Sequence, residues 1–123
     1  MVNNQAKKII QKHLISDSII RSVSMTTNYK THNKEMKKLA KLFNITSQDE
    51  NLCNEVYSVL LNSDNEVTLL TASTECLKLN IFIEKAESNL KKLINRKDLG
   101  IISFNADMTL KVWKGEVPGK ELS

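Results

Sequence analysis

The sequence is poor in residues that interrupt helices. It holds three glycines and one proline among 123 residues, and all of them except Gly100 lie in the last nine positions. Because glycine and proline mark turns and break regular elements, an interior with so few of them favours helices over a β-sandwich or a β-barrel. We therefore expect an all-α protein.

The sequence also lacks the motifs of well-known enzymes and metal sites. It has no Gly-rich phosphate loop, no HExxH pair, no nucleophile elbow and no CxxC pair. Cys53 and Cys76 stand alone at apolar positions, which is typical of buried free thiols, although a disulfide between facing helices stays open. His13 and His32 are single, and we expect both near the surface. These absences predict no enzymatic activity, no cofactor and no metal.

Long apolar runs are missing as well. No stretch approaches the roughly 20 apolar residues of a membrane span. The first ten residues, MVNNQAKKII, lack the apolar core of a signal peptide. The chain is 41% hydrophobic and 26% charged, which is the balance of an ordinary globular domain. We expect a cytoplasmic protein with no membrane partner.

Apolar residues recur at helical spacing along most of the chain. This spacing predicts helices over about residues 4–21, 28–43, 47–61, 64–79, 81–95 and 98–113. In the first of these, Ser16 and Asp17 could instead start a second short helix that runs through Met25. Alternation from Met108 to Val112 also fits a strand, but a lone strand has no partner here, so we favour a helix with Trp113 in the core. We expect one compact domain made of an N-terminal helical segment, 1–27, a main helical domain, 28–114, and a flexible tail, 115–123.

Local signals place the helix ends. Ser47 with Glu50, and Ser63 with Glu66, have the spacing of capping boxes, in which each side chain bonds to the other residue's backbone amide. Two further helix starts are expected at Asn80 and Asp98.

The segment 64–79 has two apolar stripes. One stripe comprises Val67, Leu70, Thr74 and Leu77, and the other comprises Leu69, Ala72, Ser73, Cys76 and Leu79. A surface helix has a single apolar stripe and a polar back. We therefore expect this segment to be the central helix, packed between neighbours. Its links to the adjacent helices are short, which favours antiparallel packing.

Lysines dominate one face of the segment 28–43. Lys30, Lys34, Lys37 and Lys41 recur at i, i+4, i+7 and i+11, while the residues expected to point inward are Tyr29, Met36, Leu39, Ala40 and Phe43. With a net charge of +4, a lysine stripe fits a phosphate backbone. The chain has only two arginines, however, and no aromatic side chain is interleaved with the lysines to stack on bases. Nucleic-acid binding is therefore the alternative, not the leading, interpretation.

The stretch LLNSDNEVTLLTASTECLKL resembles a HEAT-type repeat, in which paired apolar residues close one helix, an Asp lies in the turn and a Val opens the next helix. The matching residues are Leu60, Leu61, Asp64, Val67, Ala72, Leu77 and Leu79. The family's Arg after the Val is Thr68 here, which puts the usual Asp–Arg ladder in doubt. With EKAESNLKKL and SFNADMTLKVW, the match is similar to a small bacterial HEAT-like domain family of unknown function, over about residues 33–114.

The resemblance implies five or six antiparallel helices stacked as a right-handed α-α superhelix of the HEAT or armadillo type. Such stacks form continuous surfaces that bind other macromolecules. We expect a non-enzymatic protein-binding module, and the resemblance implies an immunity-like or antitoxin-like role. The partner is expected to be another protein, and monomer and homodimer both stay open. The residues expected to bind are Lys34, Lys37, Lys38 and Lys41 on one face, and Asp49, Asp64 and Glu66 on a rim of turns.

Overall fold

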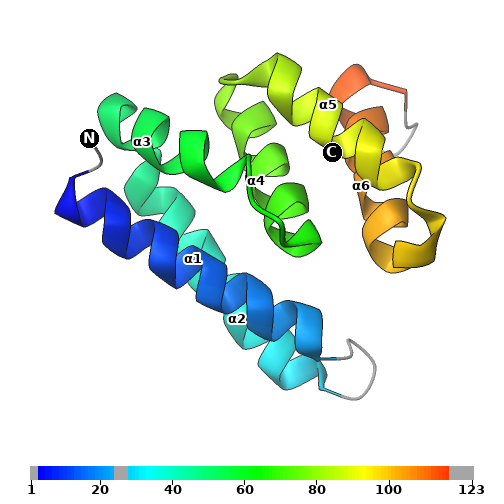
Figure 1. The fold of residues 1–123 in the computed structure, drawn as a ribbon, viewed down its shortest axis with the longest axis horizontal. Coiled ribbons are helices and arrows are strands. Elements are labelled where there is room, and N and C mark those ends of the chain that lie inside the picture. The colour runs from blue at the N-terminus through cyan, green and yellow to red at the C-terminus, as the bar shows by residue number, and fades with distance from the viewer. Residues whose placement is uncertain (1–2, 24–27, 117–123) are drawn as a thin grey trace. The chain divides into compact units, whose positions relative to one another are not determined.

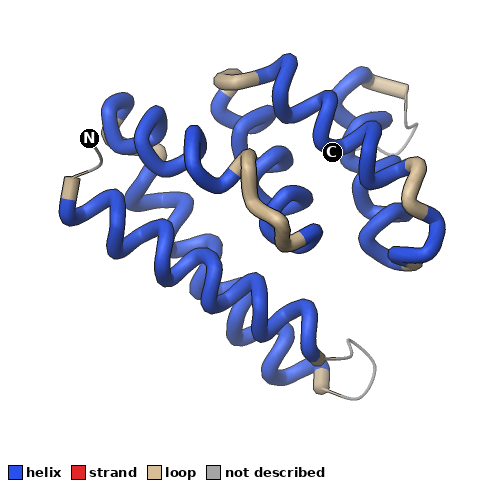
Figure 2. Tube along the Cα trace, in the orientation of Figure 1, coloured by secondary structure: helices blue, strands red, loops and turns tan. Residues whose placement is uncertain are grey.

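The computed structural model describes residues 3–23 and 28–116 (Figure 1). Within these two ranges the regular structure is entirely helical, with six α-helices, one short 3-10 helix and no strand (Figure 2). The elements are α1 (Asn4–Ser22), α2 (Tyr29–Thr46), α3 (Glu50–Leu60), α4 (Glu66–Leu79), α5 (Ile83–Ile94), η1 (Lys97–Leu99) and α6 (Ile101–Lys114). The all-α prediction is confirmed, and the last segment is a helix, not a strand.

The chain divides into two compact units, Met1–Thr68 and Leu69–Ser123. The first unit holds α1, α2 and α3, and the second holds α5, η1 and α6. Helix α4 begins in the first unit and continues in the second. This division lies within α4, whereas the sequence-based ranges meet at residue 28.

The core of the first unit is built by α1, which packs along α2 and also contacts α3 (Figure 1). Burying an aliphatic or aromatic side chain stabilises a fold by about 1.5–3 kcal/mol. The buried apolar residues of this unit are Ala6, Ile9, Leu39, Leu42, Leu52, Cys53, Val56, Tyr57, Leu60, Leu61 and Val67.

The buried face of α2 differs from the prediction. Tyr29 and Met36 are 56% and 43% exposed, and Ala40 is exposed too, so their inward placement was wrong. The prediction failed because two polar side chains, Glu35 and Thr46, are part of the buried face and have local partners. The Thr46 hydroxyl donates a hydrogen bond to the Leu42 carbonyl at 2.7 Å. The residues that do face inward are Glu35, Leu39, Leu42 and Thr46.

Both predicted capping boxes are wrong by two residues. Asp49 is the N-cap of α3 and accepts a hydrogen bond from the Leu52 amide at 3.2 Å. Asn65 accepts from the Val67 amide at 2.9 Å at the start of α4. Asp and Asn cap helices as well as Ser does, so the prediction had no energetic reason to prefer the serines. Ser47 instead donates to the Asn44 carbonyl at the end of α2.

Asn80 ends α4 and does not cap α5. Its φ of 61° is left-handed, its amide donates to the Leu77 carbonyl, and the Ile81 amide donates to the Cys76 carbonyl. This pair of bonds is a Schellman motif, which usually has Gly or Asn at the left-handed position. The N-cap of α5 is Phe82, also left-handed, with φ 48°.

Asp98 does not cap α6 either. It lies in η1, and the Arg96 guanidinium donates two hydrogen bonds to its carboxylate, at 2.9 and 2.8 Å. The N-cap of α6 is Gly100, whose φ of 59° suits a residue without a side chain.

The second unit packs α5 along α6. Its buried apolar residues are Ala72, Cys76, Leu77, Ala86, Leu90, Leu93, Ala106 and Leu110. Within α4, which is described in full, Lys78 is the one exposed residue. Residues of both predicted stripes are buried, Val67 and Leu77 from one and Ala72 and Cys76 from the other. Helix α4 is therefore buried on more than one face, as its two apolar stripes indicate.

Both cysteines are buried free thiols, as predicted. Cys53 is 6% exposed and Cys76 is fully buried. Burial raises the pKa of the Cys53 thiol, and the nearby carboxylates of Asp49 and Glu50 raise it further. Trp113 is 37% exposed, so its assignment to the core was wrong.

Candidate functional site

The predicted lysines gather on the outward face of α2. Lys34, Lys37, Lys38 and Lys41 are all exposed. Because they follow helical spacing, they line one open hollow of about 500 Å³. We call it the lysine hollow, and its lining residues are Tyr29, Lys30, Asn33, Lys34, Lys37, Lys38 and Lys41.

A second depression adjoins the hollow and lies between α1 and α2. We call it the α1–α2 groove; it has a volume of about 440 Å³ and a mostly apolar lining. Ile15 and Ile45 are 54% and 49% exposed on it. Lys38 and Lys41 line both the groove and the hollow, so the two form one surface. The lining residues of the groove are Lys12, Ile15, Ser16, Glu35, Lys38, Lys41, Leu42 and Ile45.

Glu35 is a buried carboxylate among these lysines. The residue is 3% exposed, and its Oε2 lies 3.1 Å from Lys38 Nζ. Burial acts to raise the pKa of Glu35, but hydrogen bonds from Lys38 and Ser16 and the charges of Lys38 and Lys34 outweigh it, so the pKa is lowered. Oε1 is buried and has no hydrogen-bond partner among the described residues. The groove therefore contains a charged carboxylate with one unused acceptor.

Two of the predicted acidic residues, Asp49 and Glu66, have local partners within the fold. Asp49 caps α3, and Glu66 forms an ion pair with Arg21 at 2.6 Å. Asp64 is exposed in the link before α4. Helix α3 separates Asp49 from Asp64, a span of roughly 16 Å at 1.5 Å per residue. The structure thus places the acidic residues at opposite ends of α3.

His13 is not a surface residue, contrary to the prediction. It is 2% exposed, and its Nδ1 lies 2.6 Å from Oδ2 of the fully buried Asp17. Thr68 is also fully buried, and its hydroxyl donates a hydrogen bond to the same oxygen at 2.7 Å. Asp17 thus links α1 to the start of α4. Solvent does not reach this cluster, and its hydrogen bonds join two helices of the first unit.

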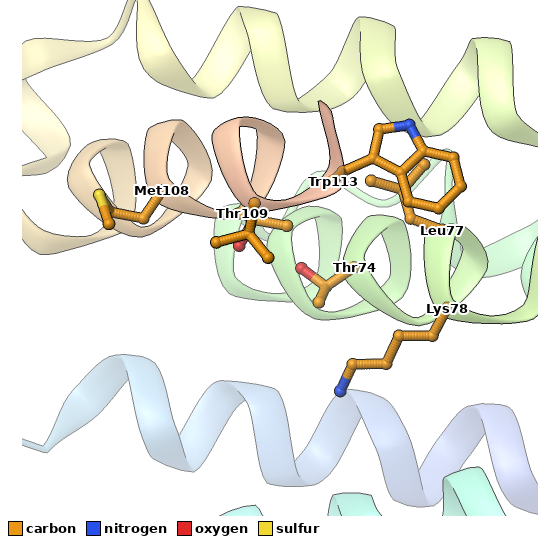
Figure 3. Close-up of a pocket in the computed structure, with 7 residues that line it drawn as sticks. Thr74, Leu77, Lys78, Met108, Thr109 and Trp113 are labelled. Atoms are coloured by element: carbon orange, nitrogen blue, oxygen red, sulfur yellow. The ribbon is translucent and has the colours of Figure 1, made fainter. Parts of the chain in front are cut away.

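The second unit has a small apolar notch between α4 and α6, of about 310 Å³ (Figure 3). Side chains from both helices surround it, and its lining is almost entirely apolar. The exposed part of Trp113 contributes to this lining. The lining residues are Thr74, Leu77, Lys78, Met108, Thr109, Val112 and Trp113.

Within residues 3–23 and 28–116, no three His, Cys, Asp or Glu side chains lie close enough together to hold a metal ion. None of the helices described there has the length and apolar character needed to cross a membrane.

Comparison with known proteins gave no relative. The chain matches no protein-family model, no curated protein and no solved structure at a significant level. The family therefore stays unassigned.

Proposed function

We propose that this chain is a non-enzymatic module that binds an acidic protein through the lysine hollow and the α1–α2 groove. The observation that carries the proposal is the sharing of Lys38 and Lys41 by both depressions. This sharing places exposed Ile15 and Ile45 directly beside a cluster of exposed lysines. A surface of this kind fits an amphipathic helix with an apolar face and acidic flanks.

The two parts of the surface have different roles in this proposal. The isoleucines and Leu42 supply apolar contact, and the lysines steer an acidic partner and select against basic ones.

A more specific form of the proposal rests on sequence resemblance. We infer that the helices form an antiparallel, right-handed superhelix like that of the small bacterial HEAT-like domains that the sequence resembles. In that family setting the surface would cap a toxin domain, as an immunity or antitoxin-like protein does. The buried side chains of α4 are consistent with a stacked arrangement of this kind.

The proposal is tested by capture from a lysate of the source organism at low and high salt. The triple variant Lys34→Glu, Lys37→Glu, Lys41→Glu reverses the charge of the hollow. The protein partner captured by the wild type at both salt levels is expected to be lost, because its acidic flanks would face acidic residues.

The matched control makes the same charge change elsewhere. Lys85, Lys91 and Lys92 are exposed on α5, and changing all three to Glu is expected to leave capture intact. Equal capture by the wild type and the α2 triple variant would refute the proposed surface.

Nucleic-acid binding is the second candidate, because Tyr29 is 56% exposed in the same hollow as Lys30 and Lys34. A base stacked on an aromatic ring contributes about 1–3 kcal/mol. If this function is correct, Tyr29→Ala weakens single-stranded RNA binding roughly 5-fold or more, and affinity falls steeply with salt. Fluorescence anisotropy with a labelled oligonucleotide measures both effects, with Tyr29→Phe as the control that keeps the ring. If Tyr29→Ala leaves the affinity for single-stranded RNA unchanged, nucleic-acid binding through this hollow is rejected.

A further inference from the structure

The last helix of the second unit has an exposed apolar stripe. Ile101, Phe104 and Val112 are 55%, 58% and 41% exposed, and Met108 is half-buried. These four residues recur at i, i+3, i+7 and i+11, so they share one helix face. The buried residues of α6 are Ser103, Ala106 and Leu110, and helical geometry places them on the opposite side. The exposed side of α6 is therefore made of large apolar side chains, whereas two of its three buried residues, Ser103 and Ala106, are small.

The stripe continues into the notch between α4 and α6. Met108 and Val112 belong to both, and the notch adds Leu77 and Trp113. Scattered exposed apolar residues are normal, but a continuous apolar surface of this kind marks an interaction site.

The charged residues beside the stripe indicate what covers it. Asp107 and Lys111 lie on one flank and form an ion pair at 3.1 Å. Asn105 and Thr109 lie on the other flank, which carries no charge. In a two-fold antiparallel helix pair each flank meets its own copy, whereas in a parallel pair the two different flanks meet.

We propose that a second copy of this chain covers the stripe, with the two α6 helices antiparallel and the two-fold axis near Met108. Phe104 of one copy then lies opposite Val112 of the other, and Asp107 lies within one turn of Lys111 of the other. The reciprocal charge pairs set the orientation, and the apolar stripe supplies the affinity. Each copy contributes only one face of one helix, which makes a small interface, so the dimer is weak and reversible.

Self-association is tested by sedimentation velocity between about 5 and 500 µM, the range in which small interfaces associate. The wild type is expected to shift from monomer to dimer across this range, and Phe104→Glu and Val112→Glu are expected to stay monomeric. Val59→Glu is the matched control, because Val59 on α3 is also a 41% exposed valine on a helix and lies outside the stripe. A wild type that stays monomeric, or a Phe104→Glu variant that dimerises like the wild type, overturns the proposal.

Orientation is tested by disulfide trapping. Met108→Cys is expected to form an intermolecular disulfide under mild oxidation, because the two-fold axis brings this residue onto its own copy. Ile101→Cys is expected not to cross-link, since Gly115 would lie opposite it. The native thiols give little background, because Cys53 and Cys76 are buried. Equal trapping of both variants would indicate parallel helices and overturn the antiparallel arrangement. That result would not bear on the function proposed for the lysine hollow and the α1–α2 groove.

Discussion

At the scale of single residues, the main discoveries are buried polar groups. His13 and Asp17 follow the same helical spacing as Ala6 and Ile9, so the sequence contained a signal that they face the core. Their burial was still not predictable, because the hydroxyl that satisfies Asp17 belongs to Thr68, 51 residues further along the chain.

Glu35 leads to a prediction about acid stability. Its folded-state pKa is below the ordinary value of 4.5, so the ionised carboxylate contributes stability above that value. This contribution is lost as the pH falls through the folded-state pKa. Glu35→Gln is therefore expected to flatten the decrease in the free energy of unfolding between about pH 6 and pH 3, measured by urea denaturation.

The control for this experiment is Glu84→Gln, which removes an exposed carboxylate from α5. If Glu35→Gln and the wild type lose stability in parallel over the acid range, the Lys38 pairing does not stabilise the folded state. Glutamine has nearly the same volume as glutamate, so Glu35→Gln introduces no packing defect that would complicate the comparison.

At the scale of helices, periodicity predicted the elements well and their caps poorly. Each predicted helix lies within three residues of the observed one at both ends. The caps were misplaced because several candidates, such as Ser47 and Asp49, stand within two residues of each other. Their energies differ too little for sequence alone to choose.

The observed caps can be separated from the predicted ones by substitution. Asp49→Ala removes the side chain that accepts from the Leu52 amide and is expected to lower the free energy of unfolding by about 1 kcal/mol. Ser47→Ala removes only a bond to the Asn44 carbonyl and is expected to change it by less than about 0.5 kcal/mol. Urea denaturation measures both, and equal losses would favour the capping box.

Helix α6 shows a different limit of sequence reading. Apolar residues surround most of it, so the pattern predicts a helix but not which face is buried. The structure buries the side with Ser103 and Ala106, because small side chains allow close approach to neighbouring helices, and leaves Ile101 and Phe104 outside.

At the scale of the whole molecule, composition was enough for the fold class. The scarcity of glycine and proline predicted the helices seen throughout the described residues. The division into two compact units was not predictable, because it falls within α4, where no turn signal exists. The proposed surfaces lie one in each unit, so their variants can be measured independently.

The burial of α4 has a consequence for how the sequence can change over evolution. With Lys78 as its one exposed position, almost any substitution in this helix alters packing, and neutral drift must concentrate elsewhere. The outward face of α2, where Lys34, Lys37, Lys38 and Lys41 are exposed, has no such constraint from folding and can diverge more freely. Distant relatives are therefore expected to be recognisable mainly by α4.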